Sequence, residues 1–446
     1  MKFEVDKQTK KDLEIFDTVK GGKSVVSLFD HTQCVGGRQK LYSFLSAPLA
    51  DIEEITKRKE SIAFFQAHFP AGMEVDKDSL DFAEYYIRHS SLSSRRISRF
   101  VAMEKKLFSK LSQNNEYYLT ETGVIATFKL VKTIHAFFLS LQDRLKDEKP
   151  PKHLQENNEK LKEIFSQPEY IDILKKDKLK AHDITDLDHV FRNTNRDDTL
   201  FLLELIYEYD AFQAIAQTAQ MYNFSYPEIV PSSENCLEIE SIFHPFVENA
   251  IANDISFDRS ANLLFISGPN MAGKSTFLKA LGIAVYLAHA GFPVPAKSMK
   301  ISVLSGLSTT INISDNLSSG YSHFYAEVMR IKDVARKLET NNNMMVLFDE
   351  LFRGTNVKDA YDGTLAIVSA FARVRTSFFI ISTHIVEVAE ELKTGESIQF
   401  SYFDIQQQDG HPAYTYKLKK GVSDVRLGMY IIRKEGLIDL INNIKH

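Results

Sequence analysis

The sequence predicts a mostly α-helical N-terminal domain that is followed by an α/β domain. Two observations support this prediction. Through the first part of the chain, apolar residues recur at helical spacing, with glycine pairs and single prolines between short helical stretches. Beyond residue 235 the pattern changes to short apolar runs typical of buried strands, and one of these runs leads through a glycine-bounded loop into a helix.

Composition narrows the class of protein. The chain has 446 residues, of which 44% are hydrophobic and 25% charged, as in ordinary soluble proteins of two or three domains. Its net charge of −5 provides no overall attraction to nucleic acid, so any DNA contact must be local.

Cysteine content and apolar runs bear on the cellular compartment. The two cysteines, Cys34 and Cys236, are too few for a metal cluster of their own, and we expect both to be buried. The charged N-terminus shows no secretory signal, and the longest apolar stretch, residues 281–296, is interrupted by a histidine, a glycine and two prolines. These features predict a cytoplasmic protein without a membrane partner.

The N-terminal domain is expected to span residues 1–230. Two long amphipathic patterns, residues 100–145 and 199–222, are typical of paired helices that form a lever arm. Prolines and polar residues at positions 226–235 indicate a boundary, after which the second domain would span residues 231–446.

A loop in the second domain has the GxxxxGK[ST] spacing of a phosphate-binding P-loop. It lies between an apolar run at residues 263–266, which suits a buried parallel strand, and a helical pattern at residues 277–288. Its glycines allow backbone N–H groups to turn toward a polyphosphate at the positive end of the helix. The predicted nucleotide contacts are Gly268, Pro269, Asn270, Met271, Ala272, Gly273, Lys274, Ser275 and Thr276. An ordinary glycine turn is the alternative interpretation.

Two carboxylates follow a second strand-like run, residues 343–350. Lys274 is predicted to reach the β- and γ-phosphates of the bound polyphosphate, and Ser275 to bind Mg²⁺. Asp349 is predicted to bind the same Mg²⁺ through water, and Glu350 to orient and deprotonate the attacking water. An acidic pair after a strand is usually the polar start of a loop, but the P-loop upstream favours the catalytic interpretation.

A third strand-like run, residues 377–382, is followed by His384. An imidazole at the carboxyl edge of the sheet is placed to hydrogen-bond the γ-phosphate and to sense its loss. A structural histidine is the alternative.

Several stretches resemble the MutS family of DNA mismatch repair proteins. Residues 13–62 resemble the start of the family's helical core domain. The positions that carry this resemblance are Gly37, Arg38, Leu41, Pro48, Leu49, Ile55 and Arg58. Residues 243–248 resemble the His-Pro element that precedes the family's nucleotide site.

Two further strings resemble family motifs with one departure each. Residues 349–355 resemble its DE-x-x-RGT string, with Phe352 where a glycine is usual. Residues 315–324 resemble its DxLxxGxSTF signature, with His323 in place of a threonine.

The resemblance implies a helical core and lever domain joined to an α/β P-loop NTPase domain of the ABC-type ATPase class. It also implies ATP and Mg²⁺ as ligands, and a homodimer in which Ser322 reaches the nucleotide of the partner subunit. The aromatic residue that stacks on adenine in the family is Ala250 here. Tyr416 is a candidate substitute, and a structural strand tyrosine is the alternative.

The leading functional hypothesis is a DNA-repair-related, ATP-dependent DNA-binding protein whose dimer changes conformation with nucleotide state. We expect no mismatch specificity, because the chain begins at the helical core and would lack the family's N-terminal mismatch-recognition and connector domains. The alternative is an ATP-driven assembly module that binds a protein partner and not DNA. Candidate phosphate contacts are Arg95, Arg96, Arg99 and the mixed-charge stretch 142–163, for which a solvated surface is the alternative.

Overall fold

The computed structural model describes residues 3–17, 22–69, 76–88, 115–144, 150–311, 323–352, 354–393, 397–408, 411–423 and 434–442. The chain divides into two compact units. The helical unit comprises Phe29–Ser46 and Glu60–Thr218, and the sheet unit comprises Met1–Leu28, Ala47–Lys59 and Ala219–His446. The sequence predicted one boundary near residue 230. In the structure the chain instead changes unit several times, three of them within a helix: α2 (Val25–Phe29), α4 (Ile52–His68) and α11 (Arg196–Tyr222).

The helical unit confirms the prediction of a mostly α-helical domain. Besides parts of α4 and α11, its helices are α3 (Val35–Ser46), α5 (Lys77–Arg88), α7 (Asn115–Arg144), α8 (Lys152–Phe165), α9 (Pro168–Lys175), α10 (Ala181–His189) and the π-helix η1 (Val190–Thr194). The sequence indicated only a mixed-charge stretch, residues 142–163, where α8 begins. α8 forms because Leu154, Leu161 and Ile164 fall on one helical face and are buried.

Aromatic rings from three helices form part of the core of the helical unit. Phe65 of α4 and Phe69, which directly follows α4, meet Phe137 of α7, with ring centroids 5.9 and 4.8 Å apart, respectively. Tyr209 of α11 lies 5.0 Å from Phe65. Aromatic pairs at these separations stabilise a core beyond the area that they bury.

Helix α7 contains a stretch, Tyr118–Arg144, that is long and apolar enough to cross a membrane by length and composition alone. However, 56% of its apolar window is buried against other parts of the protein. Because Phe137 belongs to the aromatic core, the apolar character of α7 is explained by packing within the helical unit.

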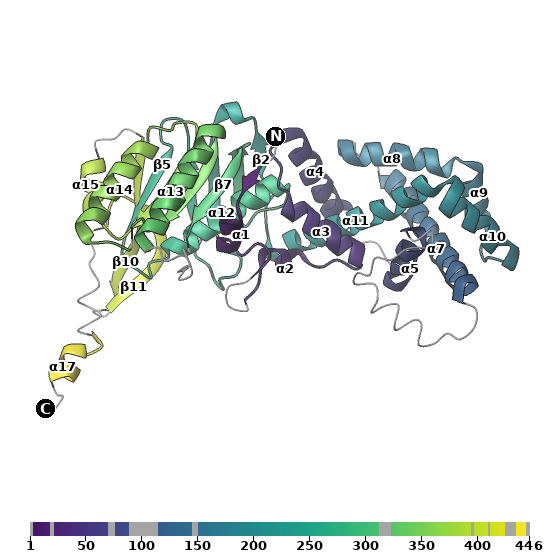
Figure 1. Ribbon diagram of the computed structural model, residues 1–446, viewed down its shortest axis with the longest axis horizontal. Helices are drawn as coiled ribbons and strands as arrows, with labels where there is room; N and C mark the ends of the chain where they lie inside the picture. The colour runs from purple at the N-terminus through teal and green to yellow at the C-terminus, as the bar shows by residue number, and fades with distance from the viewer. Residues whose placement is uncertain are drawn as a thin grey trace. The chain divides into compact units, whose positions relative to one another are not determined.

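The sheet unit contains a seven-stranded sheet in the order β1-β7-β8-β9-β5-β10-β11 (Figure 1). Its strands are β1 (Glu4–Val5), β5 (Leu263–Ser267), β7 (Gly306–Thr310), β8 (Met344–Asp349), β9 (Phe378–Thr383), β10 (Ile398–Gln408) and β11 (His411–Lys420). Neighbouring strands are parallel, except for the antiparallel β10–β11 pair. The central strands β5, β8 and β9 are buried throughout, as their unbroken apolar runs predicted.

A second, four-stranded sheet has the order β2-β6-β3-β4. Its strands are β2 (Glu228–Val230), β3 (Leu237–Ile242), β4 (Asn253–Phe257) and β6 (Ser298–Ser302). Shorter helices of the chain are α1 (Lys7–Asp12), α2 (Val25–Phe29), η2 (Ser232–Glu234) and α17 (Leu437–Asn442). The mixture of the two sheets with helices confirms the predicted α/β character of this part of the chain.

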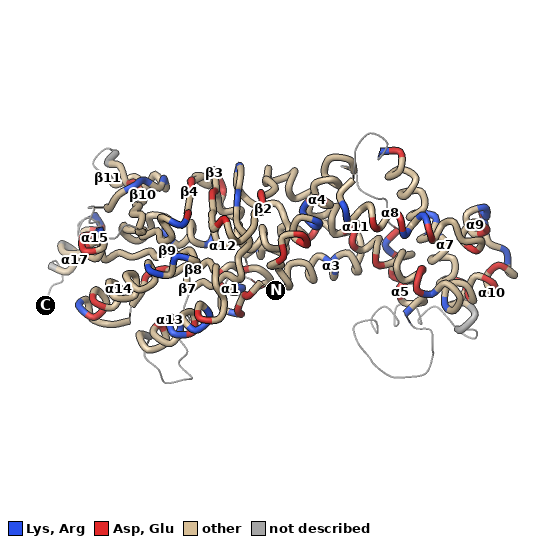
Figure 2. The backbone as a smooth tube through the Cα atoms, turned by 90° about the horizontal axis from the view of Figure 1, so that it is seen from above, with Lys and Arg blue, Asp and Glu red and all other residues tan. Residues whose placement is uncertain are grey.

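Helices cover both faces of the seven-stranded sheet. One face carries α13 (His323–Thr340), α14 (Val357–Phe371) and α15 (Glu387–Leu392), and the other carries α12 (Lys274–Ala290), which lies between the two sheets (Figure 2). Alternate residues of β8 show the division, because Val346 and Phe348 pack in the core under α13–α15 whereas Leu347 contacts α12 at Gly282. α12 is therefore buried along almost its whole length.

The first residues of the chain belong to the sheet unit and not to the helical domain in which the sequence placed them. β1 extends the sheet by pairing with β7. The Asp6 carboxylate then accepts hydrogen bonds from Arg330 and Lys337 of α13, each at 2.6 Å. These contacts join residues more than 300 positions apart, so local sequence pattern contains no signal for them.

Candidate functional site

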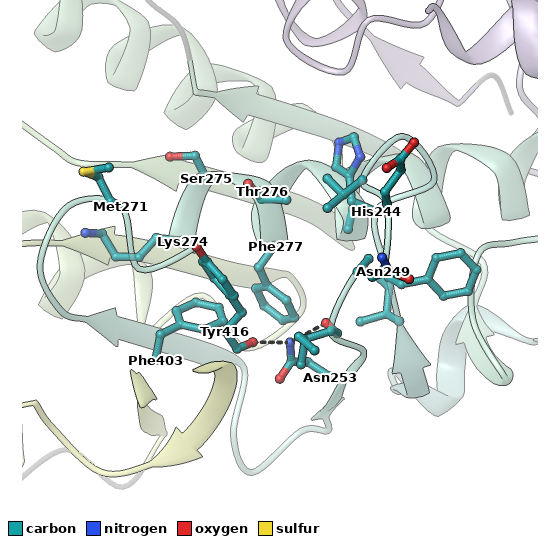
Figure 3. Close-up of a pocket in the computed structure, with 18 of the residues that line it drawn as sticks. His244, Asn249, Asn253, Met271, Lys274, Ser275, Thr276, Phe277, Phe403 and Tyr416 are labelled. Carbon is teal, nitrogen blue, oxygen red and sulfur yellow. Dashed lines mark hydrogen bonds between the residues drawn. The ribbon is translucent and has the colours of Figure 1, made fainter. Parts of the chain in front are cut away.

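A cleft of about 660 Å³ lies at the end of the sheet unit where β5 meets α12 (Figure 3). Its lining includes the loop after β5, the first turns of α12, the segment from Ile242 to Asn253, Glu350 directly after β8, and one residue each from β10 and β11. The volume is within the range of pockets that hold small molecules and cofactors.

The loop after β5 has the backbone geometry that its glycines predicted. Gly268 and Gly273 have φ values of +141° and +105°, which a side chain would strain, and Gly273 is the N-cap of α12. Met271 also has positive φ and is 76% exposed at the tip of the loop. The Nζ of Lys274 donates to the carbonyl oxygens of Gly268 and Pro269, at 2.8 and 3.0 Å, so the ammonium is held against the loop.

The next residue of α12 contacts the end of β8. The hydroxyl of Ser275 donates to Asp349 Oδ2. The other carboxylate oxygen of Asp349 accepts a 2.5 Å hydrogen bond from the hydroxyl of Ser382 in β9. The two residues that the sequence assigned to Mg²⁺ are therefore in direct contact, and Ser382 is a partner that the sequence analysis missed.

The carboxylate of Glu350 lies between two of the other predicted residues. Its Oε1 is 3.5 Å from Lys274 Nζ, and its Oε2 is 3.6 Å from His384 Nδ1. The Glu350 side chain is only 9% exposed, whereas that of His384 is 53% exposed. Glu350 also has a φ of +56°, and its backbone N–H donates to the Ser382 carbonyl. Backbone strain in a non-glycine residue is concentrated at functional sites.

Aromatic rings form another wall of the cleft. The ring of Tyr416 lies over the loop, with Cδ1 3.2 Å from the position that a Cβ on Gly273 would occupy. Phe403 of β10 also lines the cleft and packs against Phe277 of α12. Ala250, where an aromatic residue was expected from the family pattern, lines the same cleft.

A buried asparagine fixes the backbone around Tyr416. Asn253 Nδ2 donates to the Tyr416 carbonyl at 3.0 Å, and Asn253 Oδ1 accepts from the Leu418 N–H at 2.7 Å. Tyr416 has a φ of +54°, which an L-residue adopts only when its surroundings hold it there. Asn253 and Phe403 were not predicted, because neither belongs to a recognisable motif.

The predicted His-Pro element also reaches the cleft. His244 lines it, and Nδ1 of the imidazole accepts a hydrogen bond from the Phe246 N–H at 3.3 Å. Burial, together with the positive charge of Lys279, lowers the pKa of His244 to about 4. The imidazole is therefore neutral near pH 7.

Oxygen atoms at the Ser275–Asp349 contact fit Mg²⁺. Among the residues that the structure describes, no group of three or more His, Cys, Asp and Glu side chains forms a metal cage. Mg²⁺ in nucleotide sites does not need such a cage, because one or two protein oxygens share the ion with water and substrate phosphates. The hydroxyl of Ser275 and the buried carboxylate of Asp349 are ligands of this kind.

Some predicted residues lie outside the described part of the chain. These are Ser322, Arg95, Arg96, Arg99, and residues 145–149 of the mixed-charge stretch. The remaining residues predicted for the nucleotide site all line or adjoin the cleft. Residues 142–144 and 150–163 of the mixed-charge stretch belong to the helical unit. Of the two cysteines, Cys34 is buried as expected, whereas Cys236 is only partly buried.

Comparison with known proteins extends these observations. The family model for MutS domain III matches residues 8–224, and the model for MutS domain V matches residues 264–444. A protein named DNA mismatch repair protein MutS from Thermotoga maritima is 31% identical over 238 residues, which are 52% of this chain and 29% of that protein. Its namesake from Petrotoga mobilis is 29% identical over 245 residues, 54% of this chain and 30% of the relative. The matched region thus spans less than a third of the length of either relative.

The two family models together account for both the helical part and the α/β part of the molecule, in the same order along the chain. The resemblance noted in the sequence is thereby confirmed: the chain belongs to the MutS family.

Proposed function

We propose that the protein is a P-loop ATPase of the ABC type that binds ATP with Mg²⁺ in the cleft. One observation carries this proposal. The Ser275–Asp349 pair and the Lys274–Glu350 pair converge at the N-terminus of α12, which is the geometry that a bound triphosphate requires. MutS membership supports the same activity.

The residues of the phosphate end have separable roles. The backbone N–H groups of the loop and the ammonium of Lys274 bind the phosphates, which carry the opposite charge. Ser275, and Asp349 through water, would hold Mg²⁺, which when bound supplies positive charge beside the phosphates. Glu350 accepts a proton from the attacking water, and His384, next to it and partly exposed, hydrogen-bonds the γ-phosphate.

The aromatic wall suits the nucleobase. Tyr416 and Phe403 present ring faces in the same cleft as the phosphate loop, and a purine can stack on either. Tyr416 then replaces the ring that is absent at Ala250. Competition of ATP binding by GTP and CTP measures how far this arrangement selects adenine.

We further propose that ATP binding and hydrolysis drive a homodimer through conformational states that grip and release DNA by its structure. The support is the family and the names of the relatives, both described as DNA mismatch repair proteins. In this proposal Ser322 reaches the nucleotide of the partner subunit.

The experiment that tests the proposal measures ATP hydrolysis in the presence of matched, branched and single-stranded DNA. A parallel assay measures binding of each DNA with and without nucleotide. We expect hydrolysis that requires Mg²⁺ and responds to at least one DNA structure. Absence of hydrolysis under all conditions contradicts the ATPase. Hydrolysis that no DNA alters contradicts the DNA role and favours a module that binds a protein partner.

Dimerisation is tested separately by light scattering. The Glu350→Gln protein, which should retain ATP without hydrolysing it, is compared with and without ATP. We expect a dimer with ATP, and a strictly monomeric species at tens of micromolar, about the concentration that a weak interface needs, contradicts the dimer.

A further inference from the structure

A second cavity, of about 580 Å³, opens at the amino ends of the parallel strands in the seven-stranded sheet. It is lined by residues that directly precede β7, β8 and β9 and by Arg259, which lies four positions before β5. Since these strands are parallel, their amino ends lie together on one side of the sheet, and the cleft lies at their carboxyl ends. The cavity is therefore separate from the nucleotide site, and nothing in the proposed ATPase mechanism uses it.

The charge of this cavity is one-sided. Arg259 and Arg375 line it, and no aspartate or glutamate is among its described lining residues. Arg375 Nη1 donates to the Ser260 carbonyl at 3.0 Å, and Arg259 Nη2 donates to the Ser233 carbonyl. Because Ser260 adjoins Arg259 in sequence, the first contact ties Arg375 to the segment that carries the other arginine.

The backbone contacts orient the two guanidinium groups without neutralising them. Each guanidinium carries five N–H donors, and a carbonyl contact occupies one of them. Its planar fork matches the oxygens of a phosphate or carboxylate. Two such groups in one concave site, within a protein of net charge −5, favour an anionic ligand.

The rest of the lining is polar and uncharged, or aliphatic. Serine and threonine hydroxyls come from Ser232, Ser233, Ser305 and Thr376. Asn342 adds an exposed side-chain amide. Hydroxyl and amide groups donate and accept hydrogen bonds, so the site also favours a ligand that carries hydroxyl groups.

We propose that this cavity binds a small phosphorylated, hydroxyl-bearing molecule, such as a sugar phosphate, through Arg259 and Arg375. A phosphate monoester supplies the oxygens for the two guanidinium groups, and its hydroxyls face the amide and serine positions. The cavity volume is within the range of pockets for ligands of this size. A concave site of this kind suits a small molecule better than a duplex, whose phosphates lie on a convex surface.

The test uses ribose 5-phosphate as the probe in isothermal titration calorimetry. The titrated protein is the full chain with Lys274→Ala, which removes the phosphate-binding cation of the cleft. We expect saturable binding of ribose 5-phosphate and none of neutral ribose. Arg259→Ala and Arg375→Ala, each added to this background, should weaken binding by about tenfold or more, as loss of a charge-assisted hydrogen bond does.

Matched controls separate recognition from folding. Arg373→Ala removes an exposed arginine that lies two positions from Arg375 and does not line the cavity, so its affinity should equal that of the background protein. Arg259→Lys and Arg375→Lys keep the charge but lose the fork of N–H donors, so they should bind with intermediate affinity. They serve as the test if the alanine variants unfold. Three results overturn the proposal: no saturable binding up to about 10 mM probe, equal binding of ribose, or equal losses in Arg373→Ala and Arg375→Ala.

Discussion

The carboxylate of Glu350 lies 3.5 Å from the ammonium of Lys274, and both side chains are almost completely buried. The pair joins the segment that follows β8 to the phosphate loop, because Lys274 also donates to two carbonyls of that loop. In such a site the cation and the carboxylate have different tasks, so their substitutions should have different effects.

Lys274→Ala should abolish tight nucleotide binding, since it removes the ammonium that the loop holds beside the phosphates. Glu350→Gln keeps the size and hydrogen-bonding capacity of the side chain, so we expect normal ATP affinity with turnover reduced by roughly 100-fold or more. Fluorescent-nucleotide titration and phosphate release measure the two quantities. Lys358→Ala, an exposed lysine of α14, is the control. Unchanged turnover in Glu350→Gln would remove Glu350 from the role of general base.

Ser382→Ala should weaken the response to Mg²⁺. The Ser382 hydroxyl is the donor to one oxygen of Asp349, while Ser275 is the donor to the other, so that the carboxylate is held from both sides. Without Ser382 we expect the Mg²⁺ concentration for half-maximal ATP binding to rise several-fold. In EDTA, which removes Mg²⁺, the variant and the unaltered chain should have the same nucleotide affinity. This control separates a change in the position of Asp349 from a general loss of folding. An equal loss of affinity with and without Mg²⁺ would contradict this role.

Buried His289 should make stability fall in mild acid. Its Nε2 accepts the Leu304 N–H at 2.9 Å, which leaves Nδ1 to donate to the Val285 carbonyl, also at 2.9 Å. A second ring proton would face a backbone donor, and burial lowers the pKa of His289 from 6.5 to about 4. The unfolded chain therefore binds more protons between these values. The contribution of His289 to the free energy of unfolding is therefore complete above pH 6.5. It is lost as the pH falls toward 4, and the total loss is roughly 3 kcal/mol.

Urea unfolding at several pH values between 7 and 4 measures this effect. His289→Gln has no group that titrates in this range and can still accept the Leu304 N–H, so its stability should depend less on pH, even if it is lower at pH 7. A variant with the same pH dependence as the unaltered chain would show that other groups control stability in acid.

Motifs and buried strands could be predicted from the sequence because their signals are local. The apolar runs of β5, β8 and β9 and the spacing of the phosphate loop lie within a few residues of one another. By contrast, Ser382 contributes one hydroxyl to Asp349, 33 positions away, and a serine at a strand end has no signature of its own. Asn253 likewise contacts Tyr416, 163 positions away, and Phe403 belongs to β10, which pairs with the distant strand β5.

The division into units escaped prediction for the same physical reason. β1 pairs with β7 across about 300 residues, and a two-residue strand has no recognisable pattern. Helices α8 and α9 have no clear signal in the sequence, because charged residues and prolines conceal a narrow apolar face. A single boundary near residue 230 follows from composition, whereas the actual units depend on contacts between distant segments.

The last prediction concerns DNA. We expect the 446-residue chain to bind a mismatched duplex no better than its matched parent. Reading a mismatch requires that a stacked base be partly unstacked, at a cost of a few kcal/mol, by an apolar wedge inserted from the minor groove. The matched domain models are III and V, whereas the resemblance assigns the wedge to a separate N-terminal domain of the family.

Phosphate contacts from lysine and arginine side chains remain for this chain, and such contacts carry no sequence information. Binding should then weaken steeply as salt rises and should be better for bent or branched structures that a pair of helical arms can enclose. Competition at fixed salt between a G·T mismatch and its matched parent decides the matter. A preference above about tenfold, equivalent to about 1.4 kcal/mol, would mean that residues of this chain insert into the duplex, because phosphate contacts alone cannot produce it.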